Sequence, residues 1–185
     1  MIKKILLGLG LIIAAIAAAA AVQPSHFHVE RSIVVDAPAA NVFAELNDLH
    51  HWEAWSPWAK LDPNATSSYE GPESGVGAIM RWDGNMDVGK GSMTITESAQ
   101  DERVKLRLDF EKPMAGTNTS EFRLTPSGTG TMVNWSIEGE NHFIAKVMSL
   151  FMNCDEMIGG YFEQGLQNLK QVAQGNQYVI QPKEN

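Results

Sequence analysis

The fold of this chain is decided by residues 141–172, NHFIAKVMSLFMNCDEMIGGYFEQGLQNLKQV. Apolar residues recur in this segment at spacings of three and four, which is typical of a helix with one buried face. Polar residues such as Lys146, Glu163 and Gln167 fall between them. We therefore predict one long helix from Asn141 to Val172, packed against a large apolar surface formed by the rest of the chain.

Small and flexible side chains interrupt the predicted helix. Gly159 and Gly160 each cost about 1 kcal/mol relative to alanine in a helix. Met148, Met152 and Met157 adapt to irregular surfaces. Two interpretations stay open: these residues line a cavity, or the glycines allow a strand to approach closely while the methionines fill gaps in a solid core.

An apolar segment precedes the predicted domain. Ile5–Val22 contains 18 residues without a charge and follows Lys3 and Lys4. Its length suits a retained membrane anchor, whereas the alanines at Ala19–Ala21 suit a cleaved signal peptide. We predict an anchor or signal peptide over residues 1–23. The domain then lies at the inner membrane on its periplasmic, extracytoplasmic side, or is released into the periplasm after cleavage.

The remaining chain has the composition of one globular domain. We predict this domain over residues 24–174, followed by a polar tail over residues 175–185. Without the two N-terminal lysines, 12 basic residues stand against 22 acidic ones, a net charge of −10. This charge argues against a nucleic-acid partner. The single cysteine, Cys154, excludes an intrachain disulfide, and we predict that its thiol is buried on the apolar face of the long helix.

Residues 26–140 have the alternation and turn residues of β-strands. A first strand is predicted at residues 26–37, and two short helices at residues 39–49 and 49–55 follow it. Six further strands are predicted at residues 66–71, 77–83, 91–98, 103–111, 117–125 and 129–140. The predicted fold class is therefore α+β: a strand, two short helices, a six-stranded antiparallel meander and a long C-terminal helix packed on the sheet.

The alternation also assigns the two faces of the meander. One face is apolar and includes Met80, Trp82, Met93, Leu106, Leu108, Phe110, Phe122 and Trp135. The other face is polar and includes Arg81, Lys105, Arg107, Asp109 and Arg123. An antiparallel sheet with one apolar face needs a cover, and the long helix is the element left to provide it.

Three of the five tryptophans, Trp52, Trp55 and Trp58, lie within seven residues. Such a cluster buries large area while each indole keeps one polar nitrogen. It forms either a plug at one end of the sheet or an aromatic lid over a cavity mouth.

The sequence contains no recognised catalytic or phosphate-binding motif, and we predict no catalytic residue, metal site or cofactor. His26 and His28 share a strand face, but they stand at the start of the strand. A cyclase or dehydrase needs an acid or base inside an apolar pocket. Asp155, Glu156 or Tyr161 would supply such a group if the long helix were rotated; otherwise the two carboxylates are solvated.

Residues 24–173 resemble the SRPBCC or START-like helix-grip superfamily, in its bacterial polyketide cyclase/dehydrase-like branch. The resemblance is carried by the order of the elements and by the segments Arg31–Pro38, Trp52–Trp58, Gly75–Gly77, Trp82–Gly84, Gly89–Met93 and Gly165–Lys170. It implies a deep apolar cavity between the sheet and the long helix that holds a lipid or a polyketide-like molecule. Many members carry an apolar segment before the first strand, which favours the anchor.

The leading hypothesis is that a tethered or exported, non-enzymatic protein binds a hydrophobic small molecule in this cavity. The predicted cavity residues are Trp55, Trp58, Met80, Trp82, Met93, Leu106, Leu108, Phe122, Trp135, Met148, Phe151 and Met152. A cyclase or dehydrase acting on an aromatic or lipid-like substrate is one alternative. An envelope interaction module with a filled core is the other, and it would expose an apolar patch on the outer sheet face.

Overall fold

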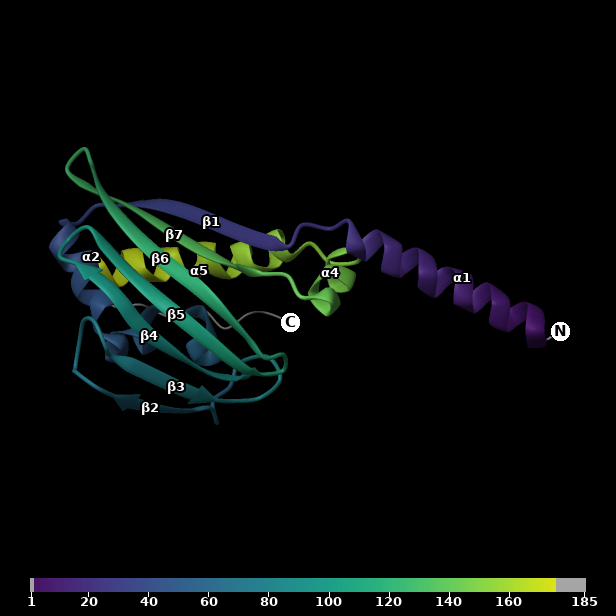
Figure 1. The fold of residues 1–185 in the computed structure, drawn as a ribbon. Coiled ribbons are helices and arrows are strands. Elements are labelled where there is room, and N and C mark those ends of the chain that lie inside the picture. Colours follow the sequence, from purple (N-terminus) through teal and green to yellow (C-terminus); the bar gives the residue numbers. More distant parts are fainter. Residues whose placement is uncertain (1, 176–185) are drawn as a thin grey trace.

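A seven-stranded antiparallel sheet wraps around the C-terminal helix in the computed structural model, which describes residues 2–175 (Figure 1). The strands are β1 (His26–Val35), β2 (Thr66–Glu70), β3 (Ile79–Asp83), β4 (Lys90–Ala99), β5 (Arg103–Lys112), β6 (Gly116–Ser127) and β7 (Gly130–Glu140). The predicted polar tail begins at Gly175, and its remaining residues lie outside the described part of the chain.

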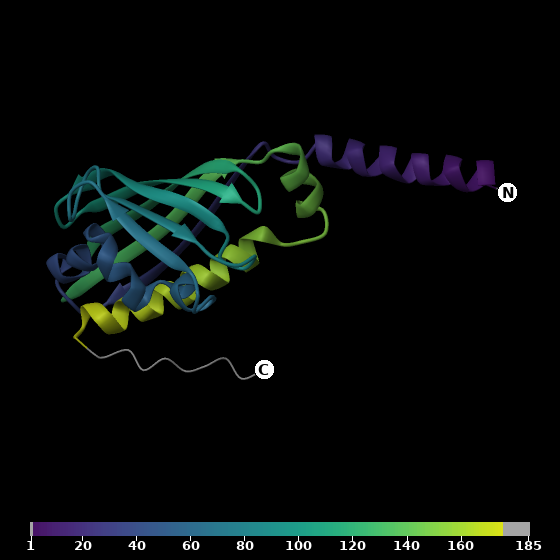
Figure 2. The same ribbon diagram turned by 90° about the horizontal axis from the view of Figure 1, so that it is seen from below.

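The helices lie before the sheet, within the β1–β2 connection and after the sheet. They are α1 (Ile2–Ala21), α2 (Ala39–Asn47), α3 (Trp52–Trp55), α4 (Phe143–Ser149) and α5 (Cys154–Ala173), with short 3-10 turns at Leu49–His51 and Pro57–Lys60. Figure 2 shows α5 crossing one face of the sheet, with α2 at the end away from α1. The predicted α+β helix-grip fold, with its long C-terminal helix, is confirmed.

The strand order β1-β7-β6-β5-β4-β3-β2 places the first and last strands side by side. His26 at the start of β1 pairs with Glu140 at the end of β7. Lys90 pairs with both Lys112 and Asp83. The β5–β6 turn and the β3–β4 loop therefore lie at the same end of the sheet as the start of β1. We call this end, where α1 joins the domain, the α1 end.

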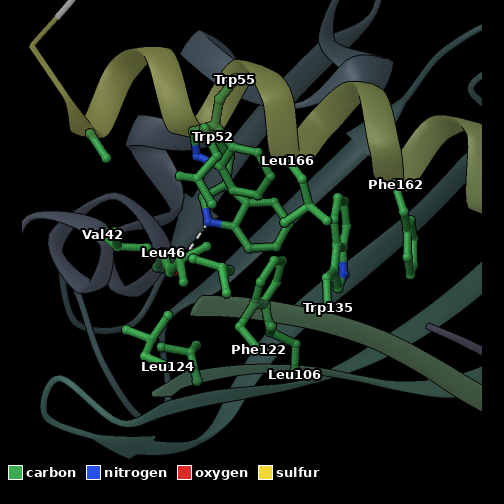
Figure 3. Packing of buried hydrophobic residues seen from close by; sticks show 14 of the residues in the cluster. Val42, Leu46, Trp52, Trp55, Leu106, Phe122, Leu124, Trp135, Phe162 and Leu166 are labelled. Atoms are coloured by element: carbon green, nitrogen blue, oxygen red, sulfur yellow. Dashed lines mark hydrogen bonds between the residues drawn. The ribbon is translucent and has the colours of Figure 1, made fainter. Parts of the chain in front are cut away.

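The core lies between the inner face of the sheet and α5 (Figure 3). Alternate strand residues such as Val104, Leu106 and Phe122 are fully buried against Leu166 and Leu169 of α5. Covering each such side chain contributes about 1.5–3 kcal/mol relative to leaving it in water. The strand residues that are buried are therefore those that the alternation of the sequence predicted to face inward.

The outer face of the sheet is polar, and several of its charged side chains form ion pairs. Arg81 pairs with Glu70 at 2.8 Å, and Arg107 pairs with Asp109 at 2.8 Å. An interaction module would expose an apolar patch on this face. Within residues 2–175, the outer sheet face has no such patch.

The tryptophan cluster closes the sheet at the end away from α1. Trp52 and Trp55 are buried, and their indole nitrogens donate to the carbonyls of Leu46 (3.1 Å) and Glu45 (3.3 Å). Because each buried indole keeps its hydrogen bond, the rings are covered without leaving an unpaired donor. The plug interpretation therefore holds for these two residues, whereas Trp58 is half-buried.

The predicted helix from 141 to 172 is divided into α4 and α5, so its predicted start was wrong. Asn153 caps α5, because its side chain accepts a hydrogen bond from the Glu156 amide at 3.3 Å. An asparagine followed three residues later by a glutamate has the spacing of a helix start. Cys154 is consequently the first residue of α5 and is half-buried, not buried as predicted.

The two mid-helix glycines of α5 have different surroundings. A Cβ at Gly159 would lie 2.0 Å from Nη2 of Arg31, whereas a Cβ at Gly160 would meet no atom within 4 Å. The space beside Gly159 is thus filled by an arginine side chain. Met148 and Met157 are exposed. Neither the glycines nor these methionines line the two hollows described below.

Candidate functional site

The inner face of the sheet changes from buried to accessible toward the α1 end. On β5, Val104 and Leu106 are fully buried, but Leu108 and Phe110 are half-buried. The same change occurs on β4, from the fully buried Ile95 to the half-buried Met93. We call the half-buried set the accessible inner surface; it consists of Met80, Trp82, Met93, Leu108 and Phe110.

Contacts with neighbouring residues fix the position of Trp82 within this surface. Its indole nitrogen donates to the Val88 carbonyl at 3.3 Å, and its ring meets Phe110 edge-on at 5.7 Å. A Cβ at Gly91 would lie 2.7 Å from the indole ring, so only glycine leaves this space on β4. With its polar nitrogen satisfied, Trp82 presents hydrocarbon to anything that binds here.

A second half-buried aromatic pair lies on the helix side of the core. Trp58 and Tyr161 of α5 have ring centroids 5.5 Å apart. Trp58 also meets the edges of Trp135 at 6.0 Å and Phe162 at 6.4 Å, and these two rings stack on each other at 3.9 Å. The aromatic rings near the middle of the inner face are therefore packed against one another.

Buried polar groups beside the aromatic core are satisfied. Ser120 donates to the Ser136 carbonyl at 3.0 Å and accepts a hydrogen bond from the Trp135 indole at 2.9 Å. Asn168 of α5 donates to the Trp55 carbonyl at 3.0 Å. These hydrogen bonds satisfy polar groups within the core and help to hold it together.

Arg31 is a charged residue on the inner face of β1, and α5 neutralises it. Its guanidinium contacts Asp155 at 3.0 Å and Glu163 at 3.0 Å, and it donates to the Glu30 carbonyl at 2.8 Å. The hydrogen bond from Arg31 lowers the pKa of Asp155 below its ordinary value. The lowered pKa favours the ionised form of Asp155, which has no proton to donate.

A polar pocket of about 550 Å³ opens beside the turn after α2. His50 contacts the Asp48 carboxylate at 2.8 Å and stacks on Tyr69 at 4.0 Å. Burial raises the pKa of Asp48, but hydrogen bonds from the His50 amide and ring outweigh it and leave the pKa below its ordinary value. His50 and His51 are exposed.

A second depression of about 530 Å³ adjoins this turn, lined in part by Glu45, His51 and Lys60. Burial raises the pKa of Glu45. Neither hollow contains a residue of the predicted cavity set.

The structure divides the predicted cavity residues into three groups. Four are buried in the packed core: Trp55, Leu106, Phe122 and Trp135. Five are half-buried beside it: Trp58, Met80, Trp82, Met93 and Leu108. The last three, Met148, Phe151 and Met152, are exposed on α4 and the segment after it.

Phe110 and Tyr161 were missing from the predicted set. Strand parity had placed Phe110 on the apolar face with Leu108, but the predicted cavity set left it out.

A seven-stranded antiparallel sheet wrapped around a long C-terminal helix defines a class of protein, the helix-grip domains. Residues 26–174 match the family described as polyketide cyclase/dehydrase and lipid transport. The chain therefore belongs to this family, and the resemblance inferred from its sequence is confirmed. A comparison with curated proteins found no match.

Solved structures from several organisms share the fold. A hypothetical protein from Helicobacter pylori matches with a TM-score of 0.60 at 14% identity, over 80% of this chain and 88% of its own. Major latex-like protein 151 from Panax ginseng matches with a TM-score of 0.56 at 12% identity, over 81% and 99%. The Aha1 structure from Colwellia psychrerythraea matches with a TM-score of 0.54 at 16% identity, over 80% and 96%. At such identities the likeness shows the fold alone.

Proposed function

We propose that this protein is a membrane-tethered, extracytoplasmic helix-grip domain that binds a hydrophobic small molecule at the accessible inner surface. The ligand class is a lipid or a polyketide-like ring system. The observation that carries the proposal is the half-buried hydrocarbon of Met80, Trp82, Met93, Leu108 and Phe110 at the α1 end of an otherwise buried face. The family description, which includes lipid transport, supports the same ligand class.

Apolar burial supplies the binding energy in this proposal. A ligand that removed about 200 Å² of apolar surface from water would gain about 5 kcal/mol, before the cost of ordering it. The five residues of the surface carry no ionisable side chain. The arrangement therefore favours binding over acid–base chemistry.

The tether in this proposal is α1, over residues 1–23 with its short linker. Among the described residues, α1 is the helix long and apolar enough to cross a membrane. Its 20 residues extend about 30 Å, which matches the hydrocarbon thickness of a bilayer. Lys3 and Lys4 hold the N-terminus in the cytoplasm. The domain is then delivered to the periplasmic side.

Native mass spectrometry of the full chain, purified gently from its host membrane, tests the proposal. We expect a stoichiometric hydrophobic adduct that is released on denaturation. The Trp82→Ala variant should lose the adduct, whereas the matched control Arg107→Ala, on the outer face, should retain it. Protein that stays empty after exposure to a panel of lipids and aromatic compounds would overturn the proposal.

A further inference from the structure

A run of large apolar side chains is exposed on α4 and on the segment that leads into α5. The most exposed are Phe151 at 72%, Ile144 at 63% and Phe143 at 57%. Met148 and Met152 are exposed in the same stretch. We call these five residues the α4 patch. Exposed apolar residues gathered in one place mark an interaction surface.

The α4 patch is attached to the end of α1. The two helices are in contact, and Ala20 near the end of α1 is fully buried. Three hydrogen bonds join the start of this segment to the linker after α1. Asn141 bonds through its amide to the Ser25 carbonyl (2.8 Å) and through its side chain to the Pro24 carbonyl (3.2 Å). Lys146 donates to the Ser25 hydroxyl at 3.0 Å. Figure 1 shows α4 beside the base of α1.

The depth of α4 relative to the membrane depends on where α1 lies. If α1 crosses the bilayer, Ala21 at its end lies at the outer membrane–water interface, and the contacts with α4 hold the patch at that level. Residues 141–152 contain Lys146 but no acidic residue, in a chain of net charge −8. A segment with large apolar side chains, a basic residue and no carboxylate suits the boundary between head groups and acyl chains.

The accessible inner surface lies at the same end of the molecule. Trp82 and Phe110 stand near the α1 ends of β3 and β5. Met114 in the β5–β6 turn, also at this end, is 45% exposed. A domain seated on the α4 patch would therefore turn its apolar binding surface toward the bilayer.

We propose that the α4 patch is buried in the outer interface of the membrane that α1 crosses, and that it seats the domain so that its ligand enters from the bilayer. This inference rests on the proposed membrane anchor. The occupant of the patch is the lipid of that membrane. The ligand class narrows to molecules that partition into the acyl region.

Site-directed fluorescence in vesicles of phosphatidylethanolamine and phosphatidylglycerol tests this proposal. The full chain first receives Cys154→Ser, and single labels are then attached through Phe151→Cys, Ile12→Cys in mid-α1, or Arg123→Cys on the outer sheet face. Lipids with quenchers at the head group or in the acyl chain report the depth of each label. We expect quenching of the Phe151 label by the shallow quencher to exceed that of the Arg123 label several-fold. The Ile12 label should respond to the deep quencher.

The three labels distinguish failure of the membrane anchor from failure of the docking of the α4 patch. If the Ile12 label is quenched but the Phe151 label responds no more than the Arg123 label, the anchor stands and the docking proposal is overturned. If the Ile12 label is not quenched, the membrane anchor and the docking that rests on it are both overturned.

A second variant, Phe151→Asp combined with Ile144→Asp, should abolish quenching at a label introduced by Met148→Cys. Because both side chains are exposed, the midpoint of thermal unfolding should stay unchanged. Persistent quenching in this variant would also overturn the docking.

Discussion

Two leucines on β5 provide a direct test of the accessible inner surface. Leu106 and Leu108 point to the same face of the sheet, but Leu106 is fully buried and Leu108 is half-buried. Leu106→Ala should lower the free energy of unfolding by about 2–5 kcal/mol, because it removes buried methyl groups and leaves a cavity. Leu108→Ala should lower it by only about 1 kcal/mol, because part of that side chain is already in contact with water.

The effects on ligand binding should run in the opposite order. Leu108→Ala removes hydrocarbon that a ligand on the accessible inner surface would cover, at a cost of about 1 kcal/mol or about fivefold in Kd. Leu106→Ala leaves that surface intact, since Leu106 has no exposed area. Folded Leu106→Ala protein should therefore retain its ligand.

Urea denaturation followed by tryptophan fluorescence gives the unfolding free energies, and native mass spectrometry gives the bound fraction of each variant. The reasoning is refuted if Leu108→Ala destabilises the fold as much as Leu106→Ala and leaves the bound fraction unchanged. In that case the α1 end of the inner face would be ordinary core.

Three further predictions concern α5. Gly160→Ala should stabilise the fold by up to about 1 kcal/mol through helix propensity; Gly159→Ala should gain less, because the Arg31 guanidinium must move, and paired urea titrations measure the difference. Asn153→Ala should cost about 0.5–2 kcal/mol by removing the cap of α5, whereas Asn153→Asp should keep it in the same assay. The pKa of Asp155 is lower in the folded state than its ordinary value. Its ion pair therefore stabilises the folded state above about pH 4, and this stabilisation is lost as the pH falls through the folded-state pKa. Asp155→Asn should therefore show a smaller drop in unfolding free energy between neutral and acid pH than the parent protein, and equal drops would contradict the assignment.

Parts of the candidate site were predictable because they follow from strand periodicity. Successive strand residues point to opposite faces, so Met80, Trp82, Met93 and Leu108 were placed on one face from their spacing alone. The start of α5 was missed although its signal is local, because the apolar period continues through Asn153 and hides the cap. Where the period and a capping residue disagree, the hydrogen-bonded cap decides the boundary.

Other features depend on contacts between residues far apart in the chain. The partners of Arg31 cannot be found from the sequence, because only the packing of α5 across β1 brings Asp155 and Glu163 to it. The exposure of Phe151 has the same origin. Its place in the apolar pattern predicts burial, yet α4 packs against the end of α1 and leaves that side chain uncovered.

The sequence by itself determined the order of the elements, the parity of the strands, the polar outer face and the apolar N-terminal segment, because each follows from the covalent spacing of apolar and polar side chains. Tertiary structure alone decided which inward residues are core and which stay accessible. Burial depends on how far α5 and the tryptophan plug extend over a curved sheet, and that coverage fully buries Leu106 but not Leu108. Periodicity specifies the direction of a side chain, whereas its burial depends on what packs opposite it.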